Sequence, residues 1–91
     1  MLRKAAKDRG CTIRIPGVCN FNSETVVLAH IRVWGMGLKS PDLLGAWCCS
    51  SCHDEVDGRT HKSGLSRDEL RLAHYDGMAR TIMQLHKEGL V

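Results

Sequence analysis

The chain has 91 residues, of which 43% are hydrophobic and 4% aromatic, and its formal net charge is +3. This composition predicts one globular domain and argues against a disordered chain. No apolar run is long enough to span a membrane, and the basic start lacks the apolar core of a secretory signal, so we expect a cytoplasmic protein without a membrane partner. With few aromatic residues, a small core of this kind usually needs a metal or disulfide staple.

The cysteines form the most informative pattern. Cys11 and Cys19 make a C-x7-C pair, and Cys49 and Cys52 make a C-x2-C pair about thirty residues later. Four thiolates in two such pairs can close a tetrahedral structural zinc site. Disulfides and free or redox thiols are the alternatives, and an odd cysteine count in a reducing cytoplasm disfavours disulfides. Cys48-x3-Cys52 is also a chelate spacing, but C-x2-C is commoner, and we interpret Cys48 as a buried strand thiol.

The first predicted elements are a knuckle and a hairpin. Residues 11–19 read as a short alternating strand turned by Pro16-Gly17, which returns the second thiol towards the first. Residues 25–33 are rich in β-branched side chains, and residues 43–48 form a second apolar run of strand length. We expect these two runs to pair as an antiparallel hairpin with a long glycine-containing loop, so that knuckle and hairpin occupy about 11–49.

Two helices are predicted after the hairpin. The first covers about 51–61, with Ser50 or Ser51 as its N-cap. The second covers about 67–88 and opens with a capping box that begins at Ser66. An apolar stripe at helical spacing predicts that the second helix covers the core: Leu70, Ala73, Met78, Ile82 and Leu85. Its histidines, His74 and His86, are predicted to be exposed and to carry no chemistry.

A hairpin followed by a helix, with one histidine on each, resembles the ββα-metal arrangement of HNH-type nucleases. Cys49-Ser50-Ser51-Cys52-His53 matches the Cys-x2-Cys-His element of zinc-stapled members, and His30 matches the position of the general base. Asp42 lies near the usual asparagine. The resemblance implies an α+β fold: a small zinc-stapled ββα-metal (HNH-like, His-Me finger) domain, spanning 1–91, with an additional C-terminal helix. It implies that Asp42 orients His30 and that His53 binds a catalytic metal.

The predicted first helix adds further candidate ligands. His53, Asp57 and His61 recur at four-residue intervals and share one face if the helix extends that far. An imidazole nitrogen with a carboxylate oxygen suits magnesium, manganese, nickel or zinc. Phosphodiester hydrolysis needs a base that activates water and a cation that stabilises charge on the phosphate, and this set would supply both.

A longer pattern resembles the lambdoid phage and prophage family typified by YbcO, which is regarded as a nuclease family. The matching segments are Arg3-Lys4-Ala5-Ala6, Cys11, Arg14 to Asn20, Val27 to Arg32, Pro41-Asp42-Leu43, Cys52 to Glu55 and Gly77 to Thr81. They cover nearly the full chain. The resemblance implies a setting in phage recombination or DNA processing, with recombination proteins as candidate partners.

We therefore predict a metal-dependent endonuclease that hydrolyses phosphodiester bonds in DNA, with a basic surface suited to the DNA backbone. The alternative is a non-catalytic zinc-stabilised module that binds nucleic acid or assists recombination, which would need the thiolates but not the histidines. A third class is a zinc scaffold that binds only protein. A homodimer is considered because small nucleases of this kind often work as dimers.

Overall fold

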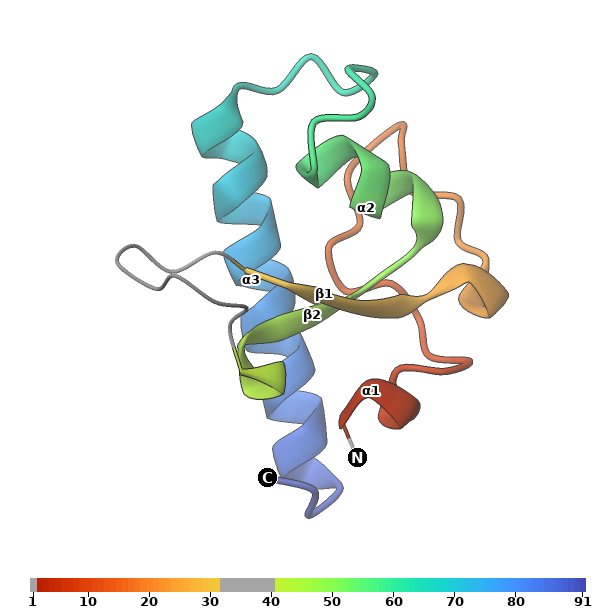
Figure 1. Cartoon of the computed structure of the whole chain (residues 1–91), viewed down its shortest axis with the longest axis vertical. Helices are drawn as coiled ribbons and strands as arrows, with labels where there is room; N and C mark the ends of the chain where they lie inside the picture. The colour runs from red at the N-terminus through yellow and green to blue at the C-terminus, as the bar shows by residue number, and fades with distance from the viewer. Residues whose placement is uncertain (1, 32–40) are drawn as a thin grey trace.

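The computed structural model describes residues 2–31 and 41–91, and these ranges form a small α+β fold. The helices and strands among them are α1 (Leu2–Ala5), β1 (Val27–His30), β2 (Gly45–Cys48), α2 (Ser50–Val56) and α3 (Arg67–Lys87). Two short 3-10 turns, Ser23–Thr25 and Asp42–Leu44, precede the strands. In Figure 1 the hairpin crosses the long α3, and α2 lies beside the upper half of that helix. Helix α3 packs chiefly against β2.

The hairpin is antiparallel, as predicted, but its strands are short. Val27 pairs with Cys48 and His30 with Gly45, so that His30 ends β1 opposite the first residue of β2. Strand β1 begins at Val27 rather than at residue 25 as predicted. The preceding residues form a 3-10 turn, because the side chain of Asn22 accepts a hydrogen bond from the backbone amide of Glu24 and caps that turn. The predicted strand 43–48 begins only at Gly45. The glycine-containing loop lies outside the described residues.

Residues 11–19 form a loop with no assigned strand, which corrects the prediction of an alternating strand. The expected turn is present, because the backbone amides of Val18 and Cys19 both donate to the carbonyl of Ile15. The extended path is interrupted at Arg14, whose φ of 52° lies in the left-handed region. The Arg14 side chain donates to the carbonyl of Cys11 at 2.9 Å, and its amide donates to the Cys11 thiol at 3.5 Å. These contacts hold the knuckle in its bent shape.

Helix α2 is shorter than the predicted 51–61 and has a different cap. Its N-cap is Cys49, whose Sγ accepts from the backbone amide of Cys52, so neither predicted serine serves. The helix ends at Val56 because the carboxylate of Glu55 binds the following chain, accepting from the Thr60 hydroxyl and from the amide and hydroxyl of Ser63. Glu55 is only 1% exposed, and these donors satisfy its buried carboxylate.

Helix α3 closely matches its predicted range. The capping box is formed as expected, with the side chains of Ser66 and Glu69 each accepting from the other's backbone amide. Gly89 follows the helix with a φ of 75°, which ends it as predicted. Leu70 and Leu85 are buried, in agreement with the predicted stripe, and three members of that stripe are partly buried: Ala73, Met78 and Ile82.

The close approach of α3 to the N-terminal loop depends on two small residues. A Cβ added to Gly77 would lie 2.7 Å from the Cγ1 of Ile13, so only glycine lets the helix come this near. The fully buried hydroxyl of Thr81 contacts the hydroxyl of Thr12 at 2.9 Å and accepts from the amide of Trp47 at 3.0 Å. Gly77 and Thr81 thereby tie α3 to both the knuckle and β2.

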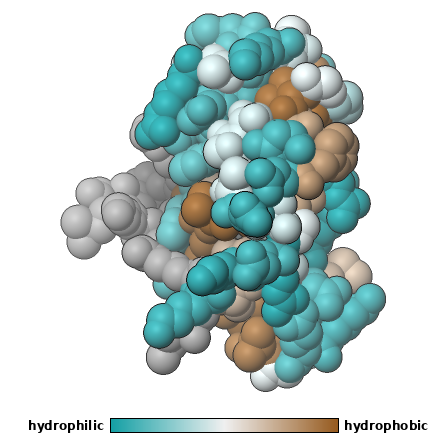
Figure 2. Space-filling model, turned by 90° about the vertical axis from the view of Figure 1, so that its right-hand side faces the viewer, coloured by the Kyte–Doolittle hydropathy of each residue, from teal (hydrophilic) through white to brown (hydrophobic). Residues whose placement is uncertain are grey.

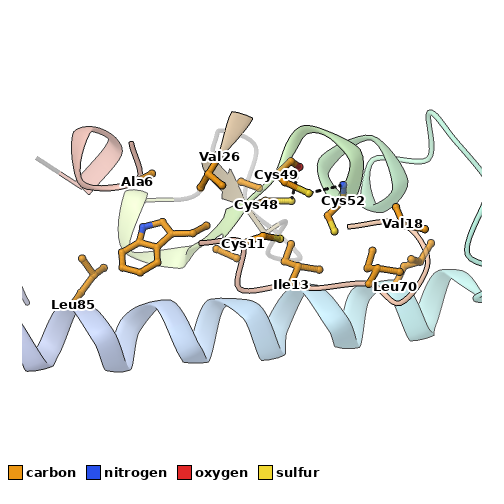
Figure 3. Packing of buried hydrophobic residues seen from close by; sticks show 14 residues of the cluster. Ala6, Cys11, Ile13, Val18, Val26, Cys48, Cys49, Cys52, Leu70 and Leu85 are labelled. Carbon is orange, nitrogen blue, oxygen red and sulfur yellow. Dashed lines mark hydrogen bonds between the residues drawn. The ribbon is translucent and has the colours of Figure 1, made fainter. Parts of the chain in front are cut away.

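The core lies between α3 and the cysteine-bearing elements. Figure 3 shows Cys11 and Ile13 packed between α3 and the start of α2, while Leu70 and Leu85 point into the same layer from α3 on either side of them. Figure 2 shows that one side of the molecule is mostly hydrophilic, with separate apolar patches. Among the described residues, no helix has the length and apolar character needed to cross a membrane.

Candidate metal centre and active-site cleft

Four cysteine thiols converge where the knuckle meets the start of α2. The Sγ atoms of Cys11, Cys19, Cys49 and Cys52 all lie within 4.8 Å of one another, and those of Cys19 and Cys49 are 3.8 Å apart. A tetrahedral site with Zn–S bonds of about 2.3 Å has S–S edges of about 3.8 Å. The four sulfurs therefore fit a structural zinc ion. Cys48 is fully buried and is not a member of this group.

The environment of the thiols favours a cation among them. Hydrogen bonds from the thiols of Cys48 and Cys52 lower the pKa of Cys11, while the contact with Cys11 raises the pKa of Cys52. Burial raises the pKa of Cys19 to about 11. One thiolate thus forms readily and opposes ionisation of its neighbours. A divalent cation would remove that repulsion, and zinc binds the ionised form.

The predicted general base and its orienting residue meet beside the hairpin. The Nε2 of His30 lies 2.7 Å from the Oδ1 of Asp42. His30 is the last residue of β1, and Asp42 opens the 3-10 turn that leads into β2, so the hairpin register brings them together. Because an ionised carboxylate only accepts, Nε2 carries the proton, and Nδ1 holds the lone pair. Nδ1 is the atom that can take a proton from water.

The histidine on α2 also meets the aspartate that follows the helix. His53 and Asp57 are four residues apart, and the Nε2 of His53 lies 3.2 Å from the Oδ2 of Asp57. Both side chains are about one-third exposed, at 32% and 39%. His61 does not join them, since α2 ends at Val56 and His61 lies in the exposed loop that follows. Of the three predicted helix ligands, the structure therefore brings two together.

A cleft of about 170 Å³ lies between the end of β1, the end of α2 and the first half of α3. Its lining includes His30, Asp57, Arg67, Arg71 and Tyr75. The cleft thus brings together the predicted general base, His30, and one predicted metal ligand, Asp57. It also contains two arginines that have no ion-pair partner among the described residues. This combination suits a phosphate group.

His74 is partly buried and lines the cleft, which corrects the prediction that it is exposed. Its Nε2 lies 2.8 Å from the carbonyl oxygen of Ala29, and a carbonyl only accepts, so Nε2 carries the proton. Burial lowers the pKa of His74, which favours the neutral ring. The sequence held a signal for this burial: His74 lies four residues after Leu70, on the predicted apolar stripe. His86 is exposed, as predicted.

Comparisons with known proteins agree with this architecture. A family model described as "Putative nuclease YbcO" matches residues 1–90. The chain is 50% identical over 95 residues to "Putative nuclease YbcO" of Escherichia coli (strain K12) and to "Putative nuclease ybcO" of Enterobacteria phage 82, covering 99% of this chain and 95% of each relative. A solved structure of "a putative bacteriophage protein from Escherichia coli str. K-12 substr. MG1655" superimposes with a TM-score of 0.83 at 48% identity, covering 98% of this chain and all of that one. The chain therefore belongs to the YbcO family of phage and prophage proteins, whose relatives are named as nucleases.

Proposed function

We propose that this chain is a metal-dependent endonuclease of the ββα-metal class that hydrolyses phosphodiester bonds in DNA. The observation that carries the proposal is the contact between His30 and Asp42, 2.7 Å long, on a strand that ends at a cationic cleft. Membership of a family named for nuclease activity supports the same reaction.

His30 acts as the general base in this proposal. Its Nδ1 takes a proton from the attacking water, while Asp42 holds the ring through Nε2 and stabilises the imidazolium that forms. This division of roles needs no movement of the backbone, because both residues are fixed by the hairpin.

The scissile phosphate lies in the cleft, beside the arginines. The guanidinium groups of Arg67 and Arg71 offer forked N–H donors that match phosphate oxygens. Both side chains project from the first turns of α3, whose capped N-terminus holds them at a fixed position relative to β1. They bind the phosphate oxygens of the substrate and hold the phosphate in place for the attack of water.

His53 and Asp57 would hold the catalytic cation through one nitrogen and one oxygen. Magnesium, manganese, nickel and zinc all accept such a pair, with water and phosphate oxygens completing the shell. A bound divalent cation would supply charge stabilisation at the phosphate and the leaving oxygen. The four cysteines are separate from this pair and would hold the structural zinc ion.

A second candidate function is a zinc-stabilised DNA-binding or recombination accessory module without catalysis. One observation favours it: among the described residues, the cysteine cluster is the only group of three or more potential metal ligands. A catalytic cation at His53 would therefore depend heavily on water and substrate for its remaining ligands.

The two candidates are separated by nicking of supercoiled DNA in the presence of magnesium, manganese, nickel or zinc. The proposal predicts that wild type nicks with at least one cation and that His53→Ala does so at least tenfold more slowly, with its zinc content unchanged. His86→Ala is the matched control, because His86 is exposed and distant in sequence from the cleft residues. Absence of nicking by zinc-loaded wild type with every cation would leave the accessory module as the function.

A further inference from the structure

A second cationic groove lies away from the proposed active site. It has a volume of about 450 Å³ and runs between the N-terminal segment and the second half of α3. Its charged lining is Arg9, Arg14, Arg80 and Lys87, and Trp47 lines it as well. None of these residues belongs to the cleft that contains His30. The proposed nuclease reaction therefore leaves this groove without a role.

In the described part of the chain, three of the four positive charges in the groove are not offset by an acidic side chain, and only Arg9 has an acidic partner, Glu88. Among the described residues, Arg14, Arg80 and Lys87 have no ion-pair partner. The guanidinium of Arg80 donates to the carbonyl oxygen of Thr12 at 2.7 Å, and that of Arg14 donates to the carbonyl oxygen of Cys11. These carbonyls orient the two side chains without neutralising them. Their charge is therefore fixed in place before any ligand binds.

Trp47 also lines the groove, and its indole ring contacts Arg9. The Trp47 side chain is buried, and its Nε1 has no hydrogen-bond partner in the described part of the chain. The guanidinium carbon of Arg9 lies 4.7 Å from the centre of the Trp47 ring, and Arg9 also pairs with Glu88 at the end of α3. A buried donor without a partner is rare in folded proteins. Because the indole Nε1 is itself buried, binding in the groove depends on the charged side chains and not on the indole donor.

The positions of the charges favour a duplex over a small anion. At 100° per residue, Arg80 and Lys87 lie about 200° around α3 from Arg67, so groove and cleft occupy opposite flanks of one helix. Their centres are about 20 Å apart at 1.5 Å per residue. An α-helix about 10–12 Å across fits the major groove of B-DNA, which two phosphate backbones border. The positive charges on the two flanks of α3 would each face one of the two phosphate backbones.

We propose that this groove binds the phosphate backbone of duplex DNA, as a contact separate from the cleavage cleft. The inference rests on DNA being the substrate proposed above, but binding at the groove does not require cleavage. The contact would be independent of sequence, because arginine and lysine contacts with phosphate carry no base information. It would position the duplex on α3 while the cleft acts on one strand.

The test is binding of a short fluorescein-labelled duplex to zinc-loaded protein, by fluorescence anisotropy without added divalent metal, between about 50 and 200 mM salt. Lys87→Gln removes one groove charge at an exposed helix end, and Arg80→Gln removes another. Each is expected to weaken binding and to lower the slope of log K against log salt by about 0.9. Lys62→Gln is the matched control, because it removes the same charge from the exposed loop before α3.

The Lys87→Gln result remains decisive if Arg80→Gln misfolds, since the Lys87 side chain makes no hydrogen bond or ion pair with the described residues. Wild-type affinity and slope in a folded Lys87→Gln protein would overturn the proposal, as would equal losses in Lys62→Gln. If wild type nicks DNA but the groove variants bind DNA normally, the groove proposal is disproved and the nuclease proposal is not. If the groove variants reduce the slope of log K against log salt but wild type never nicks DNA, the nuclease proposal is disproved and the groove proposal is not.

Discussion

The Nε2 of His30 and the Oδ1 of Asp42 lie 2.7 Å apart, although twelve residues separate them in the chain. Ala29 pairs with Ala46 and His30 with Gly45, which places the end of β1 beside the turn that begins at Asp42. The contact therefore follows from the register of the hairpin.

This contact predicts a specific effect of Asp42→Ala. The variant keeps its base but loses the group that orients the imidazole, so the kcat of nicking should fall about 10- to 100-fold, less than the 10²- to 10⁴-fold typical of removing a general base. KM should change little, because Asp42 does not contact the phosphate in this account. Asp42→Asn should recover part of the loss, since its amide oxygen can still accept from Nε2. An unchanged kcat in Asp42→Ala would contradict the assigned role.

Arg71→Gln should instead act mainly on KM. The side chain lines the cleft without an ion-pair partner among the described residues, and a lost charge-assisted hydrogen bond at a partly exposed site costs about tenfold in kcat/KM. Arg71→Lys should restore the charge but not the forked geometry, and so recover only part of the affinity. Steady-state nicking kinetics measure both values. Equal kinetics for Arg71→Gln and wild type would place the phosphate elsewhere.

Cys19→Ser should release zinc and unfold the domain. One of four ligands is lost, and structural zinc contributes on the order of 10 kcal/mol in small modules. Cys48→Ala is the matched control, because Cys48 is buried beside the cluster but is not a member of it. Circular dichroism and metal analysis report the outcome. Retention of zinc and fold by Cys19→Ser, or loss of zinc by Cys48→Ala, would refute the assignment of ligands.

Stability should depend on pH through His74. Burial lowers the pKa of His74 in the folded state, so the unfolded chain binds a proton more readily. The contribution of neutral His74 is complete above its unfolded pKa of about 6.5 and is lost as pH falls below that value. His74→Gln cannot take up the proton, but its amide can still donate to the carbonyl of Ala29. Urea unfolding should show that wild type loses more stability than His74→Gln between pH 7.5 and 5.5; parallel losses would be inconsistent with a buried neutral ring.

Gly77→Ala should destabilise the protein, although alanine has a helix propensity about 1 kcal/mol more favourable than that of glycine. The added Cβ would lie 2.7 Å from the Cγ1 of Ile13 and 3.2 Å from its backbone, so α3 would have to move away from the knuckle. Overpacking of this kind costs about 1–3 kcal/mol. Ala79→Gly, at an exposed position of the same helix, measures the propensity effect alone. A gain in unfolding free energy for Gly77→Ala would mean that this contact is not tight.

Features with local causes could be predicted from the sequence. The capping box at Ser66 and Glu69 and the stop at Gly89 depend on neighbouring residues, and α3 matches its predicted range closely. The C-x2-C spacing likewise placed Cys49 and Cys52 in one cluster. The contact of His30 with Asp42 was expected only through the family resemblance, because no local rule sets the hairpin register across the intervening loop.

Features with distant causes were missed. Helix α2 ends early because Glu55 binds Thr60 and Ser63. No sequence motif marks this turn, whereas the four-residue spacing of His53, Asp57 and His61 suggested a longer helix. Cys49 caps α2 because the cluster fixes its sulfur, whereas cap preferences favour serine. His74 is held at the hairpin by its contact with the carbonyl oxygen of Ala29, which lies 45 residues away in the chain. The groove lined by Arg80 arises from segments far apart in the sequence.

The central claim is that chemistry depends on histidines that the zinc site does not require. Its most direct test is the nicking rate of His30→Ala, measured beside wild type and His86→Ala with zinc content and DNA affinity determined on the same samples. His30→Ala should nick about 10²- to 10⁴-fold more slowly than wild type, with zinc and DNA binding retained. Nicking by His30→Ala at the wild-type rate would contradict the claim.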